Sequence, residues 1–284
     1  MIKDILVHMD ASPASRCRLD VASATARRFD AHVTGLFVKS PPVPVGFALA
    51  DAGFLADNDT AAIAAGDRAS VERASIDVEK LFCDRLARDQ VAFDWWTTDG
   101  TVARDVSHYA RCVDLVILGQ PYRDGDSLGG EFSVIGDILL EAGRPILIVP
   151  HFGSFPIIGD HALVAWNASR EAARAIHDAL PFLVTAKTVT VLSVDPTPVT
   201  PGARRTGAAD VVRHLARHGV QAKAASAVGS SIPVGDLIVS RAADVEADLI
   251  VMGAYGHSRL RELLLGGATR TLLETMTVPV LMSH

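Results

Sequence analysis

The stretch Asp248-Leu249-Ile250-Val251-Met252-Gly253 is a short, almost wholly apolar run of the kind that forms a buried strand. It repeats an earlier stretch, Asp114-Leu115-Val116-Ile117-Leu118-Gly119, at an offset of 134 residues (248 − 114). A second pair has the same offset, and it consists of Pro145-Ile146-Leu147-Ile148 and Pro279-Val280-Leu281-Met282. Two pairs in the same order at the same spacing predict an internal duplication.

The two copies begin alike but differ in length. Each copy begins with an apolar run that is followed by a polar turn, at Asp10 in the first copy and at Asn167 in the second. These two residues are 157 positions apart (167 − 10). The first copy is therefore about 23 residues longer than the second (157 − 134). Residues 39–60 are rich in Pro, Gly and Ala and show no period, so we expect them to form an inserted loop or lid.

The duplication predicts two domains in the 284-residue chain. The turn-rich residues 151–156 separate a first unit, residues 1–150, from a second, residues 156–284. In each copy, short apolar strands alternate with helical segments, which predicts an α/β fold with a doubly wound, Rossmann-like parallel sheet of five strands. In the second copy we expect strands at 162–167, 188–194, 221–227, 248–253 and 278–283. Ser169 should cap its first helix, and Ser12 and Pro13 should start the matching helix.

Composition excludes several classes of partner. The formal net charge is -6 and no run of Lys or Arg is present, so we expect no binding to nucleic acid. No apolar run approaches the length of a membrane span, and the N-terminal residues do not read as a secretion signal. Cys17, Cys83 and Cys112 have neither disulfide nor metal spacing, which predicts a reducing, cytoplasmic location.

A glycine-rich loop follows the strand that ends at Gly253. Gly253, Gly256, Gly266 and Gly267 precede a helix that we expect to begin after Thr269. Glycines let backbone N–H groups approach an anion, and the N-terminus of a helix attracts negative charge. The loop is therefore interpreted as a phosphate-binding loop at the carboxyl edge of a doubly wound sheet. The alternative interpretation is a tight connection whose glycines serve packing.

At these residues the chain resembles the universal stress protein family, and the resemblance covers both halves. It implies an adenine nucleotide alpha hydrolase-like fold, pairing of the two copies as a pseudo-dimer through their final strands, and an ATP site, with or without Mg²⁺, in the second copy. The residues that it implies for this site are Ala165, Trp166, Asn167, Val194, Met252, Gly253, Tyr255, Gly256, Gly266, Gly267, Ala268 and Thr269. Gly267 stands where the family has Ser or Thr, and Asn167 where it has Asp, which favours weakened binding.

The corresponding loop of the first copy has lost most of its glycines. Gly119 remains, while Tyr122, Phe132, Ser133 and Ile135 occupy the other motif positions. Asp10 retains the family's acid after the first strand. We expect no ATP binding here, and two interpretations stay open. One is a filled, structural copy of the site, and the other is a pocket for an apolar small molecule under the insertion, with contributions from Phe47, Leu49, Phe54 and Leu55.

Other chemical patterns are weaker. Residues 125–129 match the G-x-S-x-G elbow of serine hydrolases, but residues 120–124 separate them from the preceding strand, and Gly130 and Glu131 follow instead of a helix. His108 and His151 could serve as bases only if the fold brought them near. His214 and His218 share a helix face without a third ligand, and Trp95 and Trp96 should point to opposite faces of a strand.

The sequence thus predicts a stress-response protein that binds ATP or a related adenine nucleotide and regulates a partner without turnover. It is not expected to be an enzyme, because no catalytic base can be identified. A ligand-independent scaffold is the alternative from a different class. Whether two chains also form a homodimer is left open.

Overall fold

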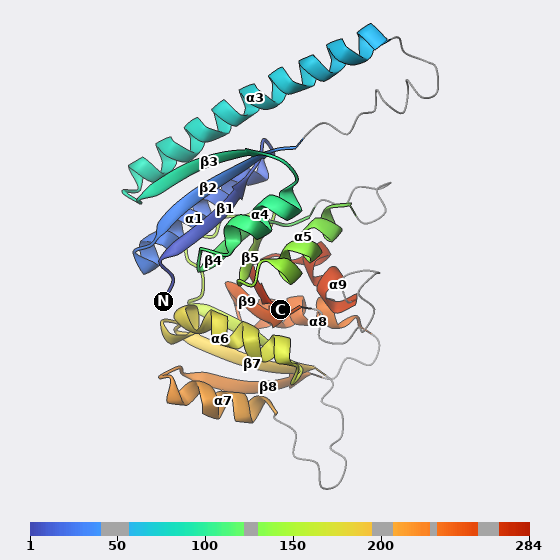
Figure 1. The fold of residues 1–284 in the computed structure, drawn as a ribbon. Helices are drawn as coiled ribbons and strands as arrows, with labels where there is room; N and C mark the ends of the chain where they lie inside the picture. Colours follow the sequence, from blue (N-terminus) through green and yellow to red (C-terminus); the bar gives the residue numbers. More distant parts are fainter. Residues whose placement is uncertain (41–56, 122–129, 195–206, 228–231, 255–266) are drawn as a thin grey trace.

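The computed structural model describes residues 1–40, 57–121, 130–194, 207–227, 232–254 and 267–284 (Figure 1). The strands of the first half are β1 (Asp4–Met9), β2 (His32–Lys39), β3 (Phe93–Asp99), β4 (Leu115–Gly119) and β5 (Ile146–Val149). Those of the second half are β6 (His161–Trp166), β7 (Thr188–Val194), β8 (Ala222–Ala227), β9 (Leu249–Gly253) and β10 (Val280–Ser283). The strands expected in the second half are confirmed to within two residues at either end.

All ten strands belong to one sheet, with the order β3-β2-β1-β4-β5-β10-β9-β6-β7-β8. Neighbouring strands within each half are parallel. The two halves join where β5 and β10 pair in antiparallel fashion, with Leu147 opposite Leu281. The expected pairing of the final strands within one chain is confirmed. The two five-stranded sheets are therefore continuous with each other rather than separate.

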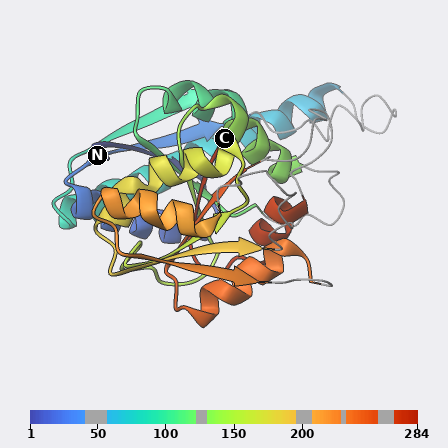
Figure 2. The same cartoon turned by 90° about the horizontal axis from the view of Figure 1, so that it is seen from below.

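Helices cover both faces of the sheet (Figures 1 and 2). The helices of the first half are α1 (Ala14–Phe29), α3 (Asp57–Arg88), α4 (Val102–Ala110) and α5 (Gly130–Glu141). Those of the second half are α6 (Arg170–Val184), α7 (Ala208–Arg217), α8 (Val234–Asp244) and α9 (Gly267–Thr275). None of these described helices is both long enough and apolar enough to cross a bilayer.

The strands contribute alternate side chains to two cores. Ile5 and Val7 of β1 pack with residues of α1 and α3, and Val164 of β6 packs with residues of α6 and α7 in the same cluster. Leu6 and Leu163 point to the other face, where α4, α5, α8 and α9 pack. Because both faces of the central strands are buried, these strands are largely apolar and show no alternation, whereas the edge strands β3 and β8 are more exposed and carry polar residues.

The aspartate that opens each repeated stretch has a structural role. The Asp114 carboxylate accepts a hydrogen bond from the backbone N–H of Lys3 at 2.7 Å. In the second half, the Asp248 carboxylate accepts from the backbone N–H groups of Gly159 at 2.7 Å and of Asp160 at 3.1 Å. Each acid thus binds the backbone N–H groups at the amino end of the neighbouring strand, β1 or β6. This is a physical reason for an acid at the start of both stretches.

Two expectations about helix starts are corrected. Helix α3 begins at Asp57, so residues 57–60 are helical and do not belong to a loop. Asp57 and Asp59 precede an alanine-rich run, and acids near the start of a helix followed by strong helix formers favour this outcome. Ser12 does not cap α1, because its N-cap is Pro13, without a side-chain cap. In α6 the Ser169 hydroxyl accepts from the N–H of Ala172 at 3.1 Å, as expected.

The two halves are also held together away from the sheet. Arg28 of α1 donates to the backbone carbonyl of Ile158 and, at 2.7 Å, to the hydroxyl of Thr185. The ring of Phe29 meets that of Phe182 edge-on, with centroids 4.9 Å apart. The last turn of α1 thereby contacts the start and the first helix of the second half.

Candidate functional site

The strand ends of the second half bring several expected site residues to one edge of the sheet. Strand β6 lies between β7 and β9, all three parallel. Their carboxyl ends carry Ala165 and Trp166, Val194, and Met252 and Gly253, respectively. These residues lie where doubly wound sheets bind ligands. Tyr255, Gly256 and Gly266 lie outside the described residues.

Asn167 follows β6 and has one oxygen committed to the local turn. Its Oδ1 accepts from the backbone N–H of Ser169 at 3.0 Å. In the first half, Asp10 Oδ1 accepts from the N–H of Ser12 at 2.8 Å. Both polar turns therefore use the same side-chain hydrogen bond, and Asn167 keeps its amide N–H groups as donors at this edge.

Gly253 is required by packing. A Cβ atom at this position would collide with the backbone N of Ala172 and the carbonyl carbon of Glu171 at the start of α6. The end of β9 thus contacts the first turn of α6 so closely that only glycine fits. This observation supports a packing role for this one glycine and does not require a phosphate.

Helix α9 begins earlier than expected, at Gly267. Its first turn contains Gly267, Ala268 and Thr269, whose N–H groups have no partner earlier in the helix. No described residue lies within 4 Å of a Cβ atom built on Gly267, and no acidic residue is present in this turn. Thr269 is 4% exposed. An anion would thus find space and backbone donors at this helix start.

These residues fit a phosphate better than a metal ion. Among the described residues, no cluster of three or more His, Cys, Asp or Glu could hold a metal. Asn167 supplies no carboxylate after β6, so Mg²⁺ would rely on the phosphates for its ligands. The fit to a nucleotide therefore depends on the start of α9 and on the strand ends beside it.

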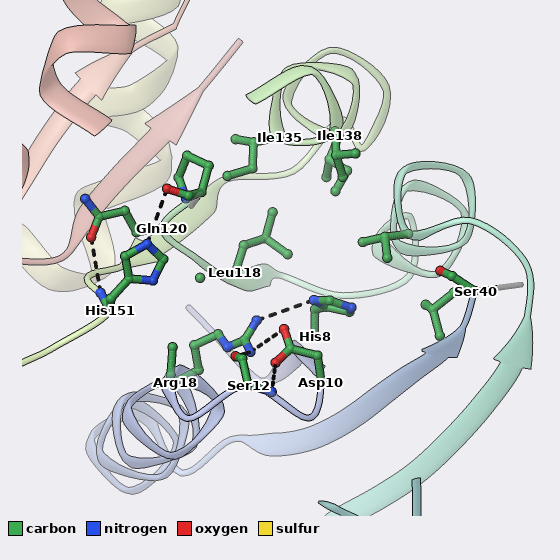
Figure 3. A pocket seen from close by; sticks show the side chains of 16 residues that line it. His8, Asp10, Ser12, Arg18, Ser40, Leu118, Gln120, Ile135, Ile138 and His151 are labelled. Carbon is green, nitrogen blue, oxygen red and sulfur yellow. Dashed lines mark hydrogen bonds and ion pairs between the residues drawn. The ribbon is translucent and has the colours of Figure 1, made fainter. Parts of the chain in front are cut away.

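The first half contains a cavity at the carboxyl ends of its own strands (Figure 3). Its volume is about 470 Å³. The lining residues are His8, Asp10, Ser12, Ala14, Arg18, Val38, Ser40, Val102, Leu118, Gly119, Gln120, Pro121, Val134, Ile135, Ile138 and His151. Among the described residues this cavity favours the open-pocket interpretation over the filled one. Phe47, Leu49, Phe54 and Leu55 lie outside the described residues.

An ion pair dominates the polar side of this cavity. Arg18 of α1 contacts the Asp10 carboxylate at 2.6 Å, and only 4% of the arginine side chain is exposed, against 39% for the aspartate. Arg18 also donates to the hydroxyl of Ser15 at 2.6 Å. Burial would raise the pKa of Asp10, but the charge and hydrogen bond of Arg18 outweigh it and hold that pKa well below its usual range.

His8 lies next to the ion pair and is neutral near pH 7. Burial and, second, the positive charge of Arg18 lower the pKa of His8 to about 4. Its Nδ1 lies 3.5 Å from a guanidinium nitrogen of Arg18. Because that nitrogen can only donate, Nδ1 is the acceptor and the proton resides on Nε2.

Gln120 connects the cavity to the second half. Its Nε2 donates to the carbonyl of Leu273 in α9 at 2.7 Å, while its Oε1 accepts from the backbone N–H of His151 at 3.1 Å. Arg270 of the same helix lies over the ring of Phe132, 5.4 Å from its centroid. The cavity wall thus touches the helix that carries part of the expected nucleotide site.

The sequence analysis did not identify His8, Arg18 and Gln120 as site residues. A signal existed for two of them. His8 interrupts the apolar strand β1, and Arg18 lies on the buried face of α1 with Ser15, Leu19 and Ala22. Gln120 has no such signal, because its role depends on a partner 153 residues away.

The weaker patterns have varied outcomes. Residues 125–129 lie outside the described residues, but α5 starts at Gly130, so the expectation that no helix follows them is wrong. Strand β4 ends at Gly119, which leaves the strand side of the hydrolase elbow unmatched.

The paired tryptophans point to opposite faces of β3, as expected. Trp95 packs against Phe82, with ring centroids 5.1 Å apart, and Trp96 is 40% exposed.

His108 and His151 line different cavities, whereas His214 and His218 are neighbours. His151 lines the cavity, His108 lies on α4, and the rings of His214 and His218 are 4.8 Å apart on α7 and at its end.

Comparison with known proteins agrees with this architecture. Residues 160–284 match the model of the universal stress protein family. A universal stress protein from Archaeoglobus fulgidus has a TM-score of 0.74 at 15% identity, over 99% of this chain and 95% of that one. A protein from Pseudomonas aeruginosa described as a universal stress protein has a TM-score of 0.61 at 18% identity, over 99% and 93%.

A functionally unknown protein from Pseudomonas aeruginosa has a TM-score of 0.59 at 15% identity, over 99% and 92% of the two chains. No curated protein matches the sequence. At these identities the structural matches establish the fold, while the family model covers the second half. Residues 160–284 are therefore similar to the universal stress protein family, and the chain as a whole has the fold of solved proteins described as universal stress proteins.

Proposed function

We propose that this protein is a cytoplasmic stress-response regulator that binds ATP or a related adenine nucleotide in its second half. The match of residues 160–284 to the universal stress protein family supports this, and the observation that carries it is the first turn of α9 at the edge where β6, β7 and β9 end. The N–H groups of Gly267, Ala268 and Thr269 would bind phosphate oxygens. Trp166, Asn167 and Val194 would contact the nucleoside.

Binding is proposed to act through conformation and partner contacts, without turnover. A general base would have to lie within hydrogen-bond reach of an attacking water. The described positions at this edge carry Trp166, Asn167 and Thr269, and none of these is a base at neutral pH. We also propose the division of the chain into units at 1–150 and 156–284.

The test is a titration of the purified full-length protein with a fluorescent ATP analogue. The wild type should bind, and Gly256→Tyr should weaken binding at least tenfold by filling the glycine loop. The matched control is Tyr122→Phe at the equivalent position of the first half, which should leave binding unchanged. Equal affinity of the wild type and Gly256→Tyr would count against the nucleotide site.

One observation favours a second candidate function, a ligand-independent scaffold. Gly253 is explained by its contact with α6 alone, and Asn167 and Gly267 depart from the family pattern. If the scaffold interpretation is right, millimolar ATP and Mg²⁺ should leave the melting temperature unchanged. If a nucleotide binds the folded state, the melting temperature must rise with its concentration.

A further inference from the structure

The cavity in the first half has the size of a small-molecule site. Its volume of about 470 Å³ falls within the range of known ligand pockets. It is built from described residues of β1, β2, α1, α4, β4 and α5 and from His151 (Figure 3). These elements are packed into the two cores, so the cavity is a rigid feature of the fold.

One wall of the cavity is apolar. Ile135 and Ile138 of α5 lie across the cavity from Asp10, Ser12 and Arg18 in Figure 3. The other apolar side chains that line the space are Ala14, Val38, Val102, Leu118, Pro121 and Val134. Such a wall stabilises a bound apolar group by removing its surface from water, at about 25 cal/mol for each Å².

The opposite side of the cavity is polar, and the two charges of its ion pair sum to zero. Arg18 and Asp10 neutralise each other at 2.6 Å. A phosphate would have to compete with Asp10 for Arg18 and would lie beside a carboxylate that stays ionised. The loop that would supply backbone donors has Phe132 where the second half has Gly266, and Ile135 where it has Thr269, and both side chains are buried.

A neutral hydroxyl group suits this side best. The Asp10 side chain is 39% exposed, so its carboxylate can accept from a ligand O–H. His8 also lines the cavity and is neutral, so it adds no charge to this side. An amine would gain from Asp10 but would be repelled by Arg18.

We propose that this cavity binds a neutral, largely apolar small molecule with one hydroxyl group, held between the branched side chains of α5 and the Asp10–Arg18 pair. The site is independent of the nucleotide site proposed for the second half. A duplicated fold thus contains two sites of different chemistry, because the first half has an ion pair and an apolar wall where the second half has a glycine-rich loop.

The experiment uses the full chain and the neutral dye N-phenyl-1-naphthylamine, whose fluorescence rises in apolar surroundings. Naphthalene, 1-naphthol, 1-naphthoate and ATP are then tested as competitors. We expect 1-naphthol to displace the dye at a concentration roughly tenfold lower than naphthalene, because it adds a hydrogen bond to a charged group. 1-Naphthoate should be weaker than naphthalene, and ATP should not displace the dye.

Two variants locate the binding. Val134→Trp should fill the cavity and reduce dye affinity at least tenfold, while Val184→Trp, at a valine of α6 that is 51% exposed, should leave it unchanged. The paired change Asp10→Asn with Arg18→Met removes both charges together, which avoids an isolated buried charge. It should retain the dye but lose the preference for 1-naphthol over naphthalene.

The proposal would be overturned if Val134→Trp bound the dye like the wild type with an unchanged circular dichroism spectrum. It would equally be overturned if 1-naphthoate or ATP displaced the dye as well as 1-naphthol. Gly256→Tyr separates the two sites, because it should impair ATP binding and leave dye binding intact. Failure of ATP to bind would leave the result for the cavity unaffected.

Discussion

The side-chain amide of Gln120 donates a 2.7 Å hydrogen bond to the backbone carbonyl of Leu273, a residue of the other half of the chain. The same side chain accepts from the N–H of His151. One residue therefore joins the cavity wall, the connection after β5 and helix α9. These hydrogen bonds lie at the junction between the two halves, where β5 pairs with β10.

Replacement of Gln120 should weaken the junction between the two halves. Gln120→Leu removes a donor and an acceptor and leaves the Leu273 carbonyl and the His151 N–H without these partners, so we expect a loss of about 1–2 kcal/mol in the free energy of unfolding. Urea denaturation measures it. Gln221→Leu, at an exposed glutamine before β8, is the control and should change the value by less than about 0.5 kcal/mol. Equal free energies of unfolding for the two variants would show that the hydrogen bonds of Gln120 do not stabilise the junction.

Arg28 should be important for the docking of α1 on the second half. Arg28→Met retains most of the aliphatic stem but loses the bonds to Ile158, Asp160 and Thr185. We expect a destabilisation of about 2 kcal/mol, because hydrogen bonds from charged donors are worth more than those from neutral donors. Arg27→Met, at the exposed neighbouring residue, should have little effect on the same thermal unfolding measurement. Similar melting temperatures for both variants would show that these contacts are not stabilising.

Replacement by alanine should have opposite effects on stability at Gly253 and at Gly267, the two glycines at the ends of the loop in the second half. Gly253→Ala forces a Cβ atom into the backbone of Ala172 and Glu171, and it should destabilise the protein by about 2–4 kcal/mol. Gly267→Ala meets open space in the first turn of α9 and should stabilise it by roughly 0.5 kcal/mol. Both are measured by denaturation without nucleotide. Tolerance of alanine at Gly253 would refute the close contact between β9 and α6.

Stability should depend on pH through His8. Its pKa is about 4 in the folded protein and 6.5 in the unfolded chain, so the unfolded state binds more protons between these values. The part of the free energy of unfolding that depends on His8 therefore has its full value above about pH 6.5 and decreases as the pH falls toward 4. His8→Gln should flatten this part of the curve of melting temperature against pH. His108→Gln, at an exposed histidine of α4, is the control, and an unchanged slope in His8→Gln would contradict the prediction.

Asp10 should act in a separate, lower pH window. Its pKa is depressed in the folded protein, so its contribution is present above its ordinary value of 3.8 and disappears as the pH falls below it. In the paired variant Asp10→Asn with Arg18→Met, the loss of stability below about pH 4 should be smaller than in the wild type. Acid titration followed by circular dichroism measures this difference. A loss identical to that of the wild type would show that the ion pair is not stabilising.

Much of the fold was predictable because it is encoded locally. The apolar run at 248–253 and its copy at 114–119 predict buried strands, and the shared offsets predict the duplication. The pairing of the final strands was implied by the family resemblance, and the structure has it. Ser169 was recognisable as a helix cap from its position alone. By contrast, the start of α3 was missed, because the Pro- and Gly-rich residues before it obscured the alanine-rich helix that follows.

The sequence by itself determined the fold class, the order of the elements, the tandem repeat and the family resemblance, since periodicity and spacing act over neighbouring residues. Only the tertiary structure decided that Arg18 meets Asp10, that Gln120 meets Leu273 and that Gly253 has no room for a side chain. These contacts depend on how the helices pack on the sheet. Corresponding helices of the two halves pack in similar places but carry different side chains. For that reason a cavity lies at the edge of the first half, where the sequence left a filled site and an open pocket as alternative interpretations.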